Sequence, residues 1–230
     1  MSGTTKVKPW ELLGRTATPE GDELTLMRRS NELVIFANGK PLMSSRMHGS
    51  EEALATLACD RARRLDSPSV LVGGLGMGFT LRATLDALPA SSTVFVAELL
   101  PAVVAWNRGV LGPLAGEPLR DPRVRVALGD VSATLRSHLH AFDVVLLDVD
   151  NGPAAFTSAA NSELYSDSGL ALIRRALKPG GVLAVWSAWE DRKFEQRLRY
   201  GRFTVKVERV RARLKRGGPR HTIFLGYSAA

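Results

Sequence analysis

The chain has 230 residues, of which 45% are hydrophobic, so its length and composition allow one sizeable domain with a buried core and a small appendage. Cys59 is the single cysteine, which excludes an internal disulfide, and the four histidines are scattered, so we expect no metal site. The chain shows neither a run of 18 apolar residues nor a secretory leader, which predicts a cytoplasmic protein without a membrane segment.

The net charge of +8 comes from the end of the chain. Residues 190–230 carry 12 Lys/Arg against 4 Asp/Glu, whereas residues 1–189 carry 19 of each. A basic segment of this kind is typical either of a solvated face or of a surface for an acidic substrate or nucleic acid. We favour the solvated face, and a nucleic-acid contact through the basic residues 192–220 stays open as the alternative.

The predicted elements begin with short strands. Residues 22–30 and 31–43 contain two apolar runs bounded by turn residues, which predicts strands, and the Asn-Gly pair at 38–39 is a strong signal for a turn. A helix is expected over residues 49–65. Residues 1–65 are therefore predicted to form a small β-hairpin appendage followed by a helix.

From residue 66 to the end, apolar strands alternate with helices. Five strand–helix repeats are followed by two alternating runs around a "KRGGPR" turn, which predicts a final hairpin. This order predicts a doubly wound, mostly parallel seven-stranded α/β sheet, whose ligand lies beyond the carboxyl ends of the strands. The predicted strands are 69–74, 93–99, 123–130, 142–150, 182–189, 203–214 and 221–228, and the predicted helices are 78–88, 102–111, 131–141, 162–177 and 190–200.

The first of these strands runs into a glycine-rich turn, "GGLGMG". Gly74, Gly76 and Gly78 give the spacing G-x-G-x-G, whereas the dinucleotide fingerprint G-x-G-x-x-G needs a glycine where Phe79 stands. A strand, a glycine turn and a helix together favour binding of the sugar or phosphate of a nucleotide. The spacing disfavours NAD as that nucleotide.

An acidic residue stands at the end of each of the next three strands. Glu98 is placed to accept hydrogen bonds from the ribose hydroxyls, and Asp130 to accept one from the exocyclic amine of adenine. Asp148 is placed to lie over the reacting end of the ligand. Each acid alone is explained equally well as a cap of the following helix. Three such acids after a glycine turn predict a nucleoside site. The other residues predicted to line this site are Met77, Leu99 and Val131.

The glycine turn and the strand-end acids resemble the class I S-adenosylmethionine-dependent methyltransferase fold. Within that fold, the stretch that begins at Asp148 is more similar to the spermidine synthase family. That family carries an aspartate pair after the fourth strand, then "GPA", an aromatic pair and "PGG". In this chain Asp148 with Asp150, residues 152–154, residues 164–165 and residues 178–181 match those motifs in order.

The resemblance implies transfer of the aminopropyl group of decarboxylated S-adenosylmethionine to a small amine. The amine must lose a proton before it attacks the carbon bonded to the sulfonium. By the same resemblance, Asp148 takes that proton, Asp150 holds cationic groups or shares the role, and Tyr165 assists by hydrogen bonding. The family also suggests a homodimer.

Two departures from the family bear on the cofactor. The aspartate of the family's glycine loop, which receives the amine of the decarboxylated cofactor, is Met77 here, and the family's Tyr-His-Glu signature keeps only Glu52. The missing carboxylate removes a repulsion against the carboxylate of intact S-adenosylmethionine, an effect on the order of a few kcal/mol. We therefore expect methyl transfer from S-adenosylmethionine to an amine or another small nucleophile. Aminopropyl transfer is the close alternative, and a non-catalytic nucleoside-binding protein with a basic tail that contacts nucleic acid is the other.

The acceptor is expected at the end of the fifth strand. Trp186 and Trp189 flank that end and Glu190 follows, which suits an amine or a flat substrate. Core packing explains Trp186 equally well, and Glu190 also suits the start of a helix. The basic turn at residues 215–220 instead favours an acceptor with a phosphate or carboxylate, so the sequence leaves the acceptor open.

Overall fold

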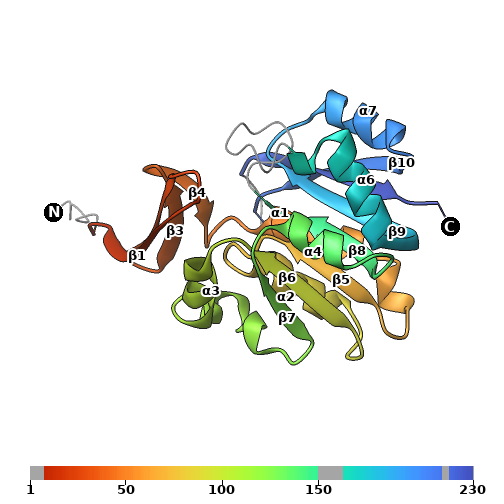
Figure 1. Cartoon of the computed structure of the whole chain (residues 1–230). Coiled ribbons are helices and arrows are strands. Elements are labelled where there is room, and N and C mark those ends of the chain that lie inside the picture. Colours follow the sequence, from red (N-terminus) through yellow and green to blue (C-terminus); the bar gives the residue numbers. More distant parts are fainter. Residues whose placement is uncertain (1–7, 150–162, 214–217, 230) are drawn as a thin grey trace. The chain divides into compact units, whose positions relative to one another are not determined.

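The computed structural model describes residues 8–149, 163–213 and 218–229 (Figure 1). Asp150 and the "GPA" motif lie outside these residues, so their roles stay predictions. The chain divides into two compact units, Met1–Met47 and His48–Ala230, and each unit is described by itself.

The boundary between the compact units differs from the sequence division at residue 65. Helix α1 (Gly49–Ala58) lies between the two boundaries and packs against α2 (Phe79–Ala87). Leu54 of α1 and Leu81 of α2 are fully buried, so α1 is part of the apolar core of the second unit. Which residues form functional domains stays a prediction.

The first unit is a four-stranded antiparallel sheet in the order β1-β2-β3-β4. Turns at Ser30 and at Asn38–Gly39, all with positive φ, join the last three strands, and the second is the turn that the Asn-Gly pair predicts. The sequence analysis missed the first strand, in which the register shifts between Leu12 and Gly14 and interrupts the alternation. The strands are β1 (Glu11–Ala17), β2 (Glu23–Arg29), β3 (Glu32–Ala37) and β4 (Lys40–Ser44).

The second unit holds a seven-stranded sheet in the order β10-β11-β9-β8-β5-β6-β7. Strands β5 to β9 run parallel, and β11 is antiparallel to both of its neighbours. The predicted α/β fold is therefore confirmed, and the carboxyl ends of its central strands meet at one edge. The strands are β5 (Ser69–Gly73), β6 (Thr93–Glu98), β7 (Val124–Leu128), β8 (Phe142–Leu147), β9 (Leu177–Ser187), β10 (Thr204–Arg211) and β11 (Arg220–Tyr227), and the further helices are α3 (Pro101–Arg108), α4 (Val131–Ser137), α6 (Asp167–Ala176) and α7 (Arg192–Tyr200).

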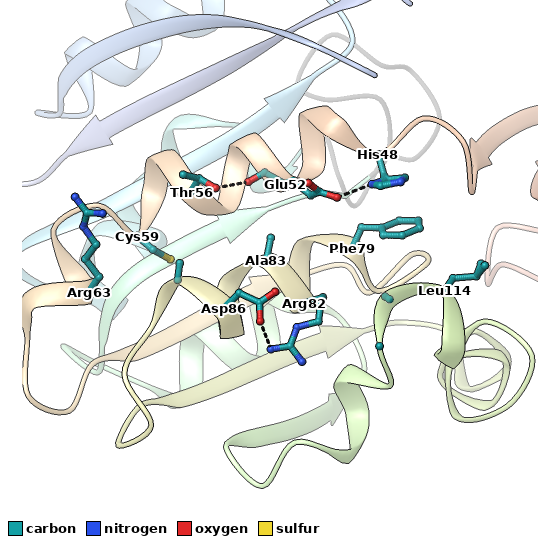
Figure 2. A pocket seen from close by; sticks show the side chains of 13 residues that line it. His48, Glu52, Thr56, Cys59, Arg63, Phe79, Arg82, Ala83, Asp86 and Leu114 are labelled. Carbon is teal, nitrogen blue, oxygen red and sulfur yellow. Dashed lines mark hydrogen bonds and ion pairs between the residues drawn. The ribbon is translucent and has the colours of Figure 1, made fainter. Parts of the chain in front are cut away.

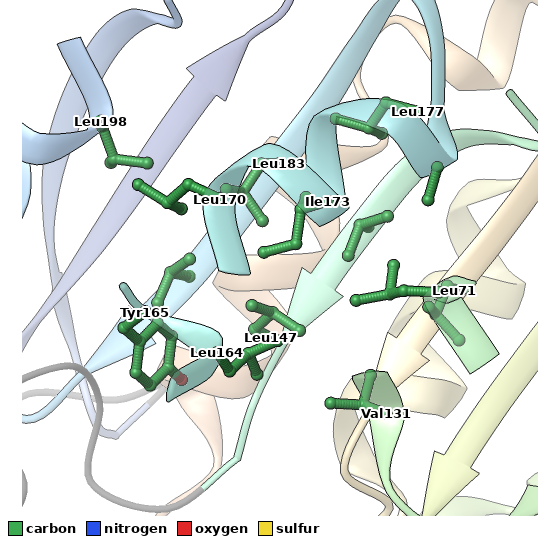
Figure 3. Close-up of a cluster of buried hydrophobic side chains, with 14 of the residues drawn as sticks. Leu71, Val131, Leu147, Leu164, Tyr165, Leu170, Ile173, Leu177, Leu183 and Leu198 are labelled. Carbon is green, nitrogen blue, oxygen red and sulfur yellow. The ribbon is translucent and has the colours of Figure 1, made fainter. Parts of the chain in front are cut away.

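Helices cover both faces of this sheet. On one face, apolar side chains of α4, α6 and α7 form a continuous buried cluster with the strands, and Figure 3 shows Leu71 and Leu183 of the sheet pointing toward Ile173 of α6. Because side chains alternate along a strand, the fully buried Val70 and Val72 point to the opposite face. Helix α1 packs against β8 and β9 there, beside α2.

One predicted helix is interrupted. The sequence predicts a helix over residues 162–177, but α6 begins only after Ser166, whose hydroxyl caps it by accepting a backbone N–H bond at 3.2 Å. The next strand begins at Leu177 rather than at Val182, because Leu177 pairs with Phe142 of β8. The Pro-Gly-Gly sequence therefore lies within β9, not between the helix and the strand.

Arg123 closes the carboxyl end of α2. Its Nη1 donates to the carbonyl oxygens of Leu85, Leu88 and Pro89 at 2.9, 3.2 and 3.2 Å, and its Nη2 lies 2.8 Å from Oδ2 of Asp121. The hydrogen bonds from Arg123 lower the pKa of Asp121 from 3.8 to about 2. Because this pKa is lowered, the pair stabilises the fold fully above the ordinary value and loses that effect as the pH falls toward about 2.

We expect Arg123→Met to lower the free energy of unfolding by about 2 kcal/mol, because three carbonyl contacts and an ion pair are lost together. Arg125→Met is the matched control, since Arg125 is exposed and, among the described residues, donates only to the carbonyls of Pro122 and Val124. That control should change the free energy by less than about 0.5 kcal/mol. Urea denaturation at pH 7 measures both variants, and equal midpoints would contradict the role given to Arg123.

Candidate active site

The glycine turn fits tightly against the end of β8. Gly74, Gly76 and Gly78 all have positive φ, of 89°, 50° and 86°, a conformation that favours glycine. A Cβ atom on Gly74 would lie 2.5 Å from the carbonyl oxygen of Asp148. The N–H of Asp148 in turn donates to the carbonyl of Gly73 at 2.9 Å. The turn and Asp148 are therefore held side by side, as the sequence predicts for two parts of one site.

Glu98 holds the glycine turn from the neighbouring strand. Its Oε2 accepts the N–H of Leu75 at 3.0 Å and its Oε1 accepts the N–H of Leu100 at 2.9 Å. The side chain is buried at the end of β6, and burial raises its pKa while these N–H donors lower it. Glu98 thus fixes the backbone of the site, and its contact with ribose hydroxyls stays a prediction.

Asn107 is a second clamp, which the sequence analysis missed. Its Nδ2 donates to the carbonyl of Gly76 at 2.8 Å and to that of Val103 at 3.0 Å, and the residue is 1% exposed. A buried amide on α3 therefore ties the middle of the glycine turn to that helix. No sequence signal marks it, because an asparagine at the end of a helix is ordinary.

The ends of β6 and β7 combine one acid with apolar side chains. Asp130 caps α4, since its Oδ1 accepts the N–H of Ser132 at 2.6 Å, and Val131 beside it is buried. Leu99 and Leu128 are 42% and 61% exposed at these strand ends. Exposed leucines beside a partly buried carboxylate suit a flat base with an exocyclic amine, and the adenine contact of Asp130 stays a prediction.

Asp148 lies directly after β8, opposite the start of α2. Thr80 of α2 donates its Oγ1 proton to Oδ2 of Asp148 at 2.5 Å. Burial raises the pKa of Asp148 from 3.8 to about 6, and the Thr80 hydrogen bond opposes that shift. A carboxylate with a pKa close to neutrality is suited to accept a proton.

Glu51 is an acid near Asp148 that the sequence analysis did not name. Burial, and after it the negative charge of Asp148, raise its pKa from 4.5 to about 7, although the Ser50 hydroxyl opposes this shift by donating to Oε2 at 2.6 Å. No Lys or Arg of the described chain forms an ion pair with either carboxylate. The first turn of α1 therefore adds a second carboxyl group to the site, one that titrates near neutral pH.

Glu52, the acid that the family signature singles out, faces another way. Its Oε1 lies 2.6 Å from Nδ1 of His48, which stacks on Phe79 with ring centroids 4.0 Å apart. Figure 2 shows these residues at one end of a groove between α1 and α2, with Arg82 and Asp86 further along it. The groove has a volume of about 650 Å³, and none of the predicted catalytic or cofactor residues that the structure describes lines it.

The predicted acceptor residues Trp189 and Glu190 line a pocket of about 480 Å³ together with Arg209, Arg220 and His221. Trp189 is 52% exposed, and Glu190 forms an ion pair with Arg209 at 2.5 Å. The pocket is therefore more basic than the predicted amine site requires.

Trp186 lies beside this pocket but does not line it. Its ring packs edge-on against His221 with centroids 4.7 Å apart. Its Nε1 is buried without a hydrogen-bond partner among the described residues. The structure therefore brings Trp189 and Glu190 together, and leaves the acceptor role of Trp186 a prediction.

Tyr165 is a core residue in this structure. It is 2% exposed, and its ring packs edge-on against Phe194. Its hydroxyl donates to the carbonyl of Val149 at 3.4 Å, which ties Val149 to the core. A direct catalytic role for Tyr165 stays a prediction.

Two further findings concern the described residues only. No group of three or more His, Cys, Asp or Glu side chains among them is placed to hold a metal ion. None of their helices is long and apolar enough to cross a membrane.

The sequence of this chain is similar to proteins of a known family. The sequence model described as "Spermine/spermidine synthase domain" matches residues 48–198. A polyamine aminopropyltransferase of Mycobacterium tuberculosis is 30% identical over 168 residues, which are 71% of this chain and 30% of that protein. One from Nitrosomonas europaea is 34% identical over 122 residues, 52% of this chain and 35% of that protein. The chain spans about a third of the length of these relatives.

Solved structures share the fold. Spermidine synthase from Thermotoga maritima has a TM-score of 0.73 at 16% identity, over 95% of this chain and 73% of that chain. A spermidine synthase in complex with the transition-state analogue AdoDATO has a TM-score of 0.71 at 16% identity, over 95% and 72%. A probable spermidine synthase from Corynebacterium glutamicum has a TM-score of 0.62 at 19% identity, over 93% and 79%.

We expect Gly74→Ala to weaken binding of 5′-methylthioadenosine more than tenfold, because the added methyl group meets backbone at positive φ and must displace the turn or Asp148. Gly180→Ala is the matched control, since Gly180 also has positive φ but nothing within 4 Å of a Cβ atom, and it lies near the amino end of β9, at the edge opposite the site. Calorimetry of both folded variants is the measurement. Unchanged affinity in Gly74→Ala would place the nucleoside elsewhere.

Proposed function

The chain belongs to the spermine/spermidine synthase family, and on that premise we propose that it transfers an aminopropyl group from decarboxylated S-adenosylmethionine to a small amine. The curated relatives carry the name polyamine aminopropyltransferase, which favours this reading over the methyl transfer expected from Met77. The broader conclusion, an alkyl-group transferase, agrees with both readings.

The observation that carries the proposal is the acidic character of the site. Asp148 and Glu51 are largely buried carboxylates, and no cation of the described residues neutralises either one. A buried negative charge without a partner is costly, so a cationic ligand complements this site. Decarboxylated S-adenosylmethionine ends in an ammonium group, whereas the intact form adds a carboxylate that these two acids would repel.

The same geometry suits the chemistry of the transfer. The free electron pair of the amine attacks the methylene carbon bonded to the sulfonium, the C–N bond forms, and the C–S bond breaks to leave a neutral thioether. The amine proton passes to Asp148, whose raised pKa suits a base near neutral pH. Because the sulfonium is already a good leaving group, the remaining task of the protein is to align the two partners.

The other site residues have supporting roles in this proposal. The glycine turn, clamped by Glu98 and Asn107, holds the nucleoside in place. Asp130 with the exposed Leu99 and Leu128 receives the base. The family resemblance further suggests a homodimer, which stays a prediction.

We expect Asp148→Asn to lower the transfer rate by at least about a hundredfold, because the amide cannot take the proton of the amine. The affinity for 5′-methylthioadenosine should change little, since the glycine turn and Glu98 are intact. The assay follows thioether release from decarboxylated S-adenosylmethionine with putrescine as the amine.

Asp167→Asn is the control for this experiment. Asp167 is exposed at the start of α6 and lies 3.6 Å from Arg197, away from the site. Wild-type turnover in Asp148→Asn would reject Asp148 as the base. A wild-type chain that binds the nucleoside but transfers nothing to any amine would support the non-catalytic reading instead.

A further inference from the structure

A chain of hydrogen bonds leads away from Glu51, the acid nearest to Asp148 in charge influence. The Ser50 hydroxyl lies 2.6 Å from Oε2 of Glu51 and 2.8 Å from Nδ1 of His221. Ser50 is fully buried, and Ser50 and His221 are 171 positions apart in the sequence. The three side chains therefore form a connection between α1 and β11 that only the tertiary fold creates.

The packing of α1 fixes this connection. Helix α1 packs against β8, β9, β10 and β11, and the N–H of Gly49 at its start donates to the carbonyl of Ala212 at 2.8 Å. The first turn of the helix is thereby anchored over the ends of the strands. Because both ends of the connection lie on anchored elements, its hydrogen bonds are preorganised.

The two ends of the connection face different surroundings. At one end, Glu51 is within the electrostatic influence of Asp148 and Glu52. At the other end, His221 lines the 480 Å³ pocket together with Trp189, which is 52% exposed. The charged groups of that pocket are Glu190, Arg209 and Arg220. The connection thus joins the acidic site to a second surface, the pocket beside Trp189.

The single hydroxyl proton of Ser50 allows two arrangements. When Glu51 is ionised, Ser50 donates to Glu51, and His221 donates its Nδ1–H to the oxygen of Ser50. When Glu51 is protonated, Glu51 donates to Ser50, Ser50 donates to Nδ1, and the imidazole proton is on Nε2. Burial lowers the pKa of His221, so the ring is neutral in both arrangements at neutral pH. The tautomer of His221 therefore reports the protonation of Glu51.

We propose that Glu51, Ser50 and His221 form a proton outlet that carries the proton released by the amine from the Asp148 site to solvent. This role rests on the proposed transfer, which releases one proton for each C–N bond that it forms. Glu51 receives the proton from Asp148, and passes it to the oxygen of Ser50 as Ser50 passes its own to Nδ1 of His221. The Nε2 proton of His221 then leaves to water, so one proton enters and one leaves. A half-turn of the imidazole ring then brings its protonated nitrogen to the pocket and its bare nitrogen to Ser50, which prepares the relay for the next proton.

The direct test is ¹⁵N NMR of the histidine side chains in the full chain, with His221→Gln to assign the signal. We expect His221 to change from the Nδ1–H to the Nε2–H tautomer as the pH falls, with a midpoint at the pKa of Glu51, about 7. Glu51→Gln and Ser50→Ala should each abolish this change. Glu52→Gln is the matched control and should keep it. A His221 signal without that midpoint, or with the same midpoint in Glu51→Gln, would overturn the outlet.

Steady-state kinetics test the proton outlet separately from the proposed transfer activity. With decarboxylated S-adenosylmethionine and putrescine, Ser50→Ala should lower kcat about tenfold or more and leave the KM of the amine unchanged, because only proton release is impaired. Wild-type kcat in this nearly isosteric variant would overturn the outlet. If the wild-type chain transfers nothing, the proposed function fails, and the NMR result still decides whether the three side chains share a proton.

Discussion

Two carboxylates that have no cationic partner among the described residues constrain the chemistry of this site. Asp148 follows β8, Glu51 lies in the first turn of α1, and the negative charge of Asp148 raises the pKa of Glu51. The fold retains both because neighbouring hydroxyls, those of Thr80 and Ser50, donate to them. A ligand with a positive charge would lower the free-energy cost of ionising both carboxyl groups. In the proposed transfer, this pair favours a cationic substrate, and the proton that the amine releases must leave the same site.

Much of the fold could be predicted from the sequence because its signals are local. The apolar runs of the parallel strands and the glycine turn between Gly74 and Gly78 predict the α/β sheet and the edge at which the site lies. Two features depend on tertiary pairing instead. The early start of β9 at Leu177 requires Phe142 as its partner, and α1 joins the second unit through its packing on α2. Neither contact leaves a periodic signal in the sequence.

The site residues also divide into those with a local sequence signal and those that only tertiary packing brings to the site. Asp148 and Glu98 are recognisable because they end strands, and the structure places both against the glycine turn. Glu51 is not recognisable, because an acid in the first turn of a helix is normally a favourable exposed residue. Its burial results from the way in which α1 lies over β9 and β11. Met77 is 4% exposed, so the loss of a carboxylate at that position does not by itself describe the charge of the site.

In the proposed function, the acids of this site select a sulfonium substrate with a positively charged tail. Calorimetry of the wild-type chain with decarboxylated and with intact S-adenosylmethionine measures this preference. We expect the decarboxylated form to bind at least about tenfold more tightly, since a carboxylate beside Glu51 and Asp148 costs more than about 1.4 kcal/mol. Equal or tighter binding of intact S-adenosylmethionine would rule out this selection and favour methyl transfer.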